Sequence, residues 1–421
     1  MAELNLTTVA GIYNRLQPEG IESLILGVSP TLGLMGKDIK VFDGLGGSGK
    51  ELLWEVNAGT GASGSYAVAY ANPGNETLAK PFVTRGRLFA TRQLSHEAWR
   101  AAKGNARAQI ELVKQAVKGA TYELRHRASS VLVGGLAGSI GRISATSNVG
   151  TPTITLSDPS EIVKFKPNQR LQAFTTVAGG LLNAGAVVTL TPAGVNYDTG
   201  QLTATGNWSA AIAAIAAGDY LIPEGDFTFV PVGMDGWNPD TLIAAGAGDN
   251  WFGVDRGGSV PMQGTRLVAA AGSLDEVIVA ADARHYQIGG QNGTALCNPL
   301  DFATLKRDQF SVITRNAIGS NGKEIAKVSF SGVMIHGANG PIEVFPDPFM
   351  KRGRVRLTNM DSWKMWSLGE AFGRMTEGMG NDGALRLAGQ DASYMVFGGY
   401  WNIVCTRPLD SMIITLPNAP A

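Results

Sequence analysis

The longest amphipathic pattern in the chain predicts a single helix that runs from Arg92 to Val131. Apolar residues recur there at steps of three and four, and this spacing places them on one helical face. Before this spine helix the pattern changes to three short strand-like segments, at residues 52–56, 66–71 and 82–90, separated by Gly, Asn and Pro. The sequence therefore predicts an extended β-loop that leads into the spine helix. The apolar positions of the helix are Leu94, Ala98, Ala102, Ala106, Ile110, Val113, Val117, Ala120, Leu124 and Ala128.

The flanks of the predicted spine helix carry more positive than negative charge. Only Glu97, Glu111 and Glu123 offset the basic residues of this segment. Such a face suits a polyanion, and phosphate contact of this kind carries no base-sequence information. The alternative is that these charges only form a surface exposed to water, which is the commoner role of charge on a helix. The candidate DNA-facing residues are Arg100, Lys103, Arg107, Lys114, Lys118 and Arg125.

Two further regions lie on either side of the β-loop and helix. Residues 1–42 predict an N-terminal arm, with a short helical pattern at residues 6–16 and a break at Pro18. Residues 142–226 contain short β-type segments between regular turn signals, and only three Lys or Arg lie between Ile143 and Asp226. This second region predicts a small β-barrel or sandwich inserted into a host domain.

The last third of the chain mixes helical and β-type patterns. Ser273 and Glu276 form a capping box for a helix over residues 273–284. Asn298 caps a second helix, with Pro299 at its first position, that runs to about residue 313. These patterns predict an α+β host domain that the inserted region interrupts once. Its β-type segments are residues 326–335, 354–357, 394–405 and 411–416.

Composition limits the functions that the chain can have. A length of 421 residues favours two or three domains. Lys plus Arg equals Asp plus Glu at 35 each, so the chain does not coat nucleic acid by bulk charge, and any polyanion contact is local. The 55 Gly and 17% charged residues fit a loop-rich, β-rich chain with surface suited to burial between subunits.

Cysteine use and hydropathy predict a protein made in the cytoplasm. Cys297 and Cys405 are the only cysteines, and two free buried thiols are expected, although a disulfide between them stays open. The N-terminus has neither a basic start nor a continuous apolar stretch of a secretory signal. The most apolar run, residues 210–217, is well below the roughly 18 residues that suggest a membrane span.

A near match to a phosphate-binding loop is the sharpest enzymatic candidate. Residues 44–50 follow the pattern G-x-x-x-x-G-K, but Glu51 replaces the Ser or Thr that holds magnesium. Residues 52–56 also predict a strand where the motif needs a helix N-terminus. A flexible glycine joint is the favoured interpretation, and a nucleotide-binding enzyme is kept as a remote alternative.

No other residue set predicts catalysis, a metal site or a cofactor. The four histidines lack the spacing or Cys partners of a zinc site, and Ser139 follows a helix, which is the wrong context for a nucleophile elbow. Asp235, Asp240 and Asp347 could act as acid and base only if the fold brings them together. Trp363, Trp366 and Trp401 are expected in a core or a subunit interface. The four histidines are His96, His126, His285 and His336.

The order of these parts resembles the major capsid protein of tailed bacteriophages, which has the Hong Kong 97 phage fold. More specific resemblance lies in residues 21–30, similar to the family's arm, and in residues 344–349 and 356–363, similar to its D-P and D-x-W stretch. Residues 399–415 look like its closing strands, and residues 155–171 resemble the opening of an inserted domain. The likeness covers most of the chain.

The resemblance implies a structural function without a reaction. Many copies would form hexamers and pentamers of an icosahedral shell around double-stranded DNA, in a virion made in the cytoplasm of a bacterial host. The β-loop would lie over an adjacent subunit, and a scaffold, a portal and a decoration protein would be partners. Some members cross-link a β-loop Lys to an Asn, for which Lys50, Lys80 and Asn359 are the candidates here. An encapsulin-type compartment shares the fold and is the main alternative.

The resemblance also implies a division of the chain. The expected parts are the arm (1–42), the extended β-loop (43–91), the spine helix of a peripheral domain (92–141), the inserted β-domain (142–226), the continued peripheral domain (227–284), the axial domain at the capsomer centre (285–345) and the C-terminal part of both domains (346–421).

Overall fold

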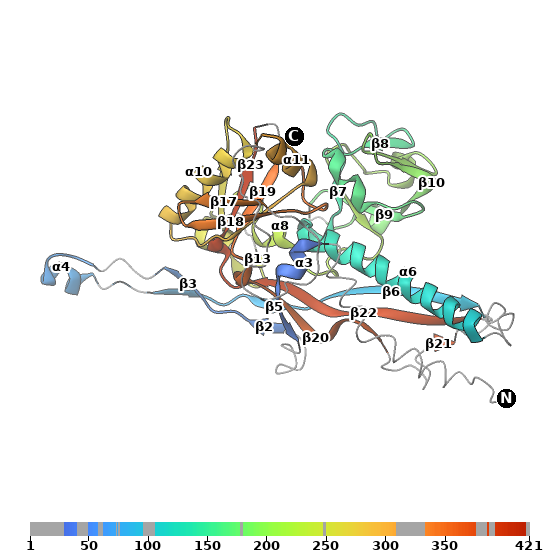
Figure 1. Cartoon of the computed structure of the whole chain (residues 1–421), viewed down its shortest axis with the longest axis horizontal. Helices are drawn as coiled ribbons and strands as arrows, with labels where there is room; N and C mark the ends of the chain where they lie inside the picture. Colours follow the sequence, from blue (N-terminus) through green and yellow to red (C-terminus); the bar gives the residue numbers. More distant parts are fainter. Residues whose placement is uncertain are drawn as a thin grey trace.

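The computed structural model describes most of the chain (Figure 1). The described residues are 29–39, 49–57, 62–72, 74, 76–95, 106–176, 180–246, 250–308, 333–375, 385–386 and 392–417. The predicted helical pattern of the arm at residues 6–16 and most of the glycine joint lie outside them. The structure combines helices with several sheets, as the α+β prediction requires.

A long sheet and one long helix form the lower layer in Figure 1. The strand order is β1-β20-β22-β21, and β6 pairs with the other side of β22. Helix α6 (Ala106–Val133) packs on one face of this sheet. Within the sheet, Trp363 and Trp401 are fully buried and Trp366 nearly so. The prediction of a core position for these tryptophans is therefore confirmed. The strands are β1 (Gly36–Ile39), β6 (Gly86–Ser95), β20 (Trp363–Arg374), β21 (Leu385–Arg386) and β22 (Ala392–Cys405).

The predicted start of the spine helix at Arg92 is wrong, because Arg92 lies in β6. Ten consecutive residues of β6 pair with β22. The backbone N–H and C=O groups of this segment therefore form hydrogen bonds between strands in place of those within a helix. Leu88 and Ala90 alternate with exposed residues at the two-residue period of a strand. Residues 96–105 lie outside the described chain, and the helix is described from Ala106.

The extended β-loop projects to the left in Figure 1 as two short ribbons and a terminal helix. Strand β2 (Gly49–Glu51) pairs with β5 (Phe82–Thr84), and β3 (Trp54–Asn57) pairs with β4 (Thr77–Ala79). The strand predicted at residues 66–71 is wrong, since this segment is helix α4 (Tyr66–Ala71). Three alanines in its six residues favour a helix, and no partner strand is described for it.

Residues 141–223 form a six-stranded sheet with its own hydrophobic core. Its order is β7-β12-β9-β10-β11-β8, and a bridge between Ile143 and Leu156 connects the two outer strands. This closure fits the barrel that the short strands predicted. Among the residues that the structure describes, Val163 alone packs against both this core and that of the long sheet. The strands are β7 (Gly141–Arg142), β8 (Thr153–Thr155), β9 (Arg170–Phe174), β10 (Val188–Asn196), β11 (Gln201–Ala204) and β12 (Tyr220–Pro223), with the short helix α7 (Trp208–Ala211).

A second six-stranded sheet, of order β15-β23-β19-β16-β18-β17, packs against α10 (Leu274–Gln287) and α11 (Pro299–Asp308). The capping box of Ser273 and Glu276 is present, and Asn298 Oδ1 accepts a hydrogen bond from Leu300 N at 2.9 Å. Both predicted helix starts are therefore confirmed. Residues 309–332, which include the predicted end of α11, lie outside the described chain. The strands are β15 (Thr265–Val268), β16 (Thr294–Cys297), β17 (Val333–Gly337), β18 (Gly340–Pro346), β19 (Arg354–Thr358) and β23 (Ser411–Thr415).

A buried carboxylate holds the first described residues against the body. Ser29 Oγ and Thr31 Oγ1 donate to Asp347 Oδ2 at 2.6 Å and 2.5 Å, and Phe349 N donates to Asp347 Oδ1 at 2.9 Å. Burial raises the pKa of Asp347, and these hydrogen bonds oppose the rise. Asp347 is thus a structural anchor for the short helix α3 (Pro30–Leu34). The remaining elements are α8 (Met234–Trp237), α9 (Val260–Gln263), β13 (Asn250–Trp251) and β14 (Val254–Asp255).

Candidate functional site

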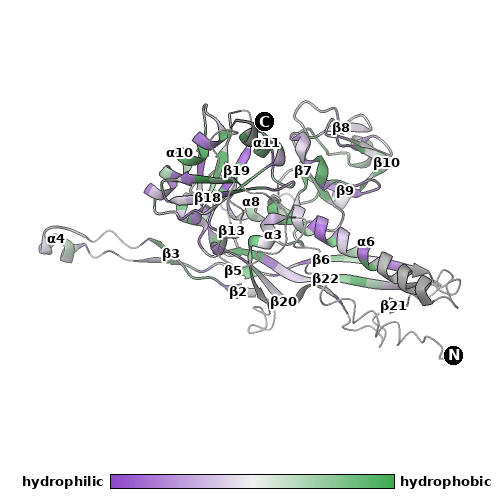
Figure 2. Cartoon of the chain, viewed as in Figure 1, coloured by the Kyte–Doolittle hydropathy of each residue, from purple (hydrophilic) through white to green (hydrophobic). Residues whose placement is uncertain are grey.

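The tip of the β-loop is an exposed aromatic surface. In α4, Tyr66 is 84% exposed, Tyr70 is 78% exposed and Val68 is 51% exposed. The two tyrosine rings stack with their centroids 6.1 Å apart. Figure 2 shows apolar residues in α4, far from the rest of the chain. Since isolated helices this short are unstable in water, a surface of this kind suits burial against another molecule.

The root of the β-loop is fixed by two tryptophans. Trp54 Nε1 donates to Thr406 O at 3.0 Å, and the Trp54 ring packs edge to face on Trp237 at 6.0 Å. Trp237 is fully buried, packs on Trp251 at 5.4 Å and donates from Nε1 to Ile403 O at 2.9 Å. The loop therefore starts from the main core and ends in an exposed tip.

The structure places only part of the predicted basic face of the spine helix. Arg100 and Lys103 lie outside the described residues, and Arg107 and Lys114 lie on α6 with side chains that are not described. Lys118 is exposed, whereas Arg125 is partly buried, and burial lowers its pKa. Contact between this face and DNA remains a prediction.

The C-terminal half of α6 binds the six-stranded sheet of residues 141–223. His126 Nε2 lies 2.8 Å from Val163 O, and the Lys166 ammonium lies 5.5 Å from the centre of the Tyr122 ring. Arg127 donates to Asp226 from Nε at 2.8 Å and to Gly138 O at 3.0 Å. These contacts fasten both ends of the sheet unit to the helix, so part of the basic segment serves packing within the chain.

His126 makes the stability of this contact depend on pH. Burial, followed by the positive charge of Lys166, lowers the pKa of His126 from 6.5 to about 4. The folded state therefore binds fewer protons than the unfolded state between these values, and stability falls as the pH drops from about 6.5 to about 4. We expect His126→Gln, which cannot titrate, to remove about 2–3 kcal/mol of this loss.

Urea unfolding of the two proteins at several pH values between 4 and 7 measures this difference. Asp301 and Asp347, whose pKa values are raised by burial, contribute with the opposite sign, but they are present in both proteins and cancel. His336→Gln, at an exposed position, is the matched control. Equal pH slopes for wild type and His126→Gln would contradict the assignment.

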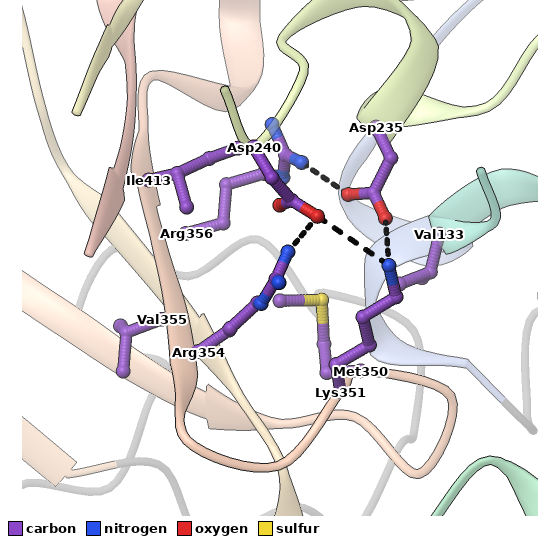
Figure 3. A pocket seen from close by; sticks show the side chains of 9 residues that line it. All are labelled: Val133, Asp235, Asp240, Met350, Lys351, Arg354, Val355, Arg356 and Ile413. Carbon is purple, nitrogen blue, oxygen red and sulfur yellow. Dashed lines mark hydrogen bonds and ion pairs between the residues drawn. The ribbon is translucent and has the colours of Figure 1, made fainter. Parts of the chain in front are cut away.

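A cluster of charged side chains lies where α8, β19 and the end of α6 meet (Figure 3). Arg356 Nη2 donates to Asp235 Oδ1 at 2.6 Å, and Lys351 Nζ lies 3.4 Å from Asp235 Oδ2. Asp240 pairs with Arg354 and lies 3.5 Å from Lys351 Nζ. The sequence offered Asp235, Asp240 and Asp347 as candidates for an acid and a base. The structure brings the first two together with three cations that the sequence analysis missed, and it places Asp347 apart, on Ser29 and Thr31.

The electrostatics of this cluster favour structure over acid–base chemistry. Burial alone would raise the pKa of Asp235, but Lys351 and Arg356 outweigh it and hold that pKa below its usual value. Burial alone would lower the pKa of Lys351, but the neighbouring carboxylates, Asp235 above all, outweigh it, and that pKa is raised. Both groups stay ionised near neutral pH, and neither is poised to transfer a proton. The alternating basic residues of the segment KRGRVR were the available signal for this cluster.

The other enzymatic candidates are also used for structure. Gly49 to Glu51 form β2 and residues 54–57 form β3, so the helix that a phosphate-binding loop needs is a strand here. Lys50 Nζ lies 5.1 Å from the centre of the Trp366 ring. Cys297 and Cys405 are free and buried, and burial raises the pKa of both thiols. Within the described residues, no group of three or more His, Cys, Asp or Glu could hold a metal ion.

Comparison with known proteins identifies the fold. No model of a protein family matches the sequence, and no curated protein sequence matches it. The structure is similar to a chain of the cyanophage A-1(L) capsid asymmetric unit, with a TM-score of 0.54 and 11% identity over 92% of this chain and 93% of that one. The chain has the tailed-phage capsid fold.

Two further similarities of the capsid fold are weaker. The capsid of a native GTA particle matches with a TM-score of 0.43 and 7% identity, over 94% of this chain and 90% of that one. An encapsulin complex from Synechococcus elongatus matches with a TM-score of 0.42 and 6% identity, over 92% and 88%. Neither similarity decides between classes of shell.

The structure describes the surroundings of the candidate cross-linking residues. Asn359 Oδ1 accepts a hydrogen bond from Asp361 N at 3.0 Å and caps a short 3-10 helix, and Lys80 is exposed on the β-loop. Cross-linking by Lys50 or Lys80 remains a prediction. Among the described helices, none is both long enough and apolar enough to cross a membrane.

Proposed function

We propose that this chain is the major subunit of an icosahedral shell that encloses double-stranded DNA. The observation that carries the proposal is the capsid fold together with the exposed aromatic tip of a β-loop whose root is fixed in the core. A tip of this kind leaves apolar surface in water unless a neighbouring copy covers it. The function is geometric, and copies form hexamers and pentamers without a catalytic reaction.

The proposed surroundings follow from a tailed-phage shell. The subunit is made in the cytoplasm of a bacterial host and resides in the virion, with a scaffold, a portal and a decoration protein as partners. The closed six-stranded sheet of residues 141–223 is the proposed inserted domain. Its separate core supports this division, because that unit buries its own apolar side chains.

Electron microscopy of the purified native assembly tests the proposal. We expect closed icosahedral particles that contain double-stranded DNA. Closed particles that contain an enzyme cargo in place of DNA would favour the encapsulin-type compartment. Discrete monomers at the concentrations at which shells normally form would contradict both and reopen the remote nucleotide-binding alternative, which predicts ATP binding that is lost in Lys50→Ala.

The tip of the β-loop provides a specific prediction for assembly. We expect Tyr66→Ser combined with Tyr70→Ser to raise the subunit concentration needed for assembly at least about tenfold. The reason is that burying each apolar ring in a contact contributes about 1.5–3 kcal/mol to the free energy of association. Light scattering of assembling subunits measures this threshold. The free energy of unfolding should change by less than about 0.5 kcal/mol, because both side chains are exposed in the subunit.

Tyr197→Ser is the matched control, since Tyr197 is 58% exposed in the turn between β10 and β11. It should leave the assembly threshold unchanged. If the tip variant assembles at the wild-type threshold, then α4 is not a subunit contact.

A further inference from the structure

Helix α6 covers one face of the long sheet, and the opposite face is open along β6 and the adjoining N-terminal part of β22, whereas the root of the β-loop covers it at Trp366. On β6, Leu88 and Ala90 are buried, and Arg92 reaches α6, where it donates to Gly119 O at 3.0 Å and to Glu123 at 2.7 Å. Because side chains alternate along a strand, the opposite face of β6 carries the residues between them. Pairing with β22 places Tyr394, Val396 and Tyr400 on that same open face. The open-face residues of β6 are Arg87, Phe89, Thr91 and Gln93.

This open face combines exposed guanidinium groups with aromatic rings. The Arg87 guanidinium lies 4.0 Å from the centre of the Phe229 ring, and that of Arg85 lies 5.2 Å from the centre of the Tyr400 ring. Phe89 is 40% exposed and packs edge to face on Tyr400 at 5.6 Å. Neither β6 nor β22 contains an Asp or Glu. The two cations are therefore held in place by rings and are not neutralised by a carboxylate of either strand.

The position of the sheet unit of residues 141–223 indicates which face is concave in a shell. This unit attaches to α6 through His126 and Lys166, so it lies on the covered side of the long sheet. In a closed shell, bulky units on the inner side converge and compete for the enclosed volume, whereas units on the outer side diverge. The covered side is thus the better outer side, which leaves the open face directed inward.

We propose that the open face of the long sheet, through Arg85 and Arg87, contacts the phosphate backbone of the enclosed double-stranded DNA. The proposal rests on the shell function proposed above and names the surface that meets the contents. The contact is independent of sequence, because guanidinium groups on phosphate read no base edges. It places the DNA opposite the basic face of α6, and the two faces cannot both be directed inward in one shell.

The salt dependence of DNA binding tests this assignment. The full-length, unassembled chain is titrated with a double-stranded DNA fragment of arbitrary sequence at several salt concentrations. The logarithm of the binding constant falls with the logarithm of the salt concentration, with a slope of about 0.9 for each phosphate contact. We expect Arg85→Gln combined with Arg87→Gln to reduce the magnitude of this slope by the amount that corresponds to about two phosphate contacts.

Two matched variants complete the experiment. Arg85→Lys combined with Arg87→Lys keeps both charges and should retain the wild-type slope. Lys118→Gln removes an exposed charge from the α6 side and should leave the slope unchanged. Thermal unfolding of each variant confirms that the chain is folded, which is expected because Arg85, Arg87 and Lys118 are exposed.

The outcomes separate this inference from the shell function. A slope that falls in Lys118→Gln, and not in the double Gln variant, overturns the inference and assigns the DNA to α6. No DNA binding by a chain that still forms closed shells also overturns it, while the shell function stands. A double Gln variant that loses shell formation but keeps the DNA slope shows that the open face is a subunit contact, which again overturns it. Absence of shells in wild type is instead a failure of the proposed function.

Discussion

Asp235→Ala is expected to lower the free energy of unfolding by about 3–5 kcal/mol, because it removes one partner of a buried ion pair. Arg356 is 1% exposed and would keep its charge in the core, where Asn238 and Ser411 offer it only longer contacts of 3.3 Å. Of the ion pairs that Lys351 makes with described residues, the one with Asp240, at 3.5 Å, would remain. Unfolding in guanidinium chloride, followed by tryptophan fluorescence, measures the loss.

Asp240→Ala is the internal control for this cluster. Asp240 pairs with Arg354 and Lys351, but its side chain is 31% exposed, and water can replace it. We expect a loss of about 1 kcal/mol, as for partly exposed ion pairs. Equal losses for the two variants would show that burial does not determine the strength of this cluster.

The second large effect is expected at Trp237, which joins the root of the β-loop to the main core. Trp237→Ala should lower the free energy of unfolding by about 3–5 kcal/mol, because it leaves a cavity between Trp54 and Trp251. It should also raise the concentration needed for assembly, since Trp54 would lose the ring that fixes the loop. Denaturant unfolding and light scattering measure the two effects separately.

Trp237→Phe separates packing from hydrogen bonding at this position. It keeps an aromatic ring but loses the hydrogen bond to Ile403 O, so we expect a loss of about 1–2 kcal/mol and little change in assembly. If Phe is as harmful as Ala, the indole N–H, and not the packed ring, holds the root of the loop.

Local signals in the sequence predicted much of the fold because the residues that cause them act over short distances. The capping box of Ser273 and Glu276 and the Asn298 cap each satisfy backbone groups within three residues. The strands β19, β22 and β23 were found for the same reason, since β19 alternates polar and apolar residues and β22 and β23 are largely apolar. Resemblance to a capsid family supplied the fold that these local signals alone could not assemble.

The errors occurred where distant parts of the chain decide the structure. Arg92 continues a helical spacing by chance, but pairing with β22, about 300 residues away, makes it a strand. At the tip of the β-loop, Tyr66 and Tyr70 have the β-propensity of aromatic residues, yet helix α4 forms where no partner strand is described. The local pattern does not show whether a distant partner strand is present.

The candidate site was predicted less well than the fold. Asp235 and Asp240 were noticed as isolated carboxylates, but Lys351, Arg354 and Arg356 lie more than 100 residues later, and only the fold brings them together. The basic face of the spine helix was visible in sequence, but its charges do not show which side of a layer they occupy. Orientation in a shell is a property of the packed layer and not of the helix.

The parallel pairing of β1 with β20 has a consequence for how identical copies meet during synthesis. Strand β1 occupies an edge of the long sheet, and on the other side Arg87 N donates to Phe229 O, outside the ladder. At this point of the β6 edge, a backbone donor that could otherwise pair with a strand from another copy is already used. An edge that is blocked at this point disfavours strand pairing between copies there and leaves contacts between side chains, which are reversible and permit misplaced subunits to dissociate and correct their position.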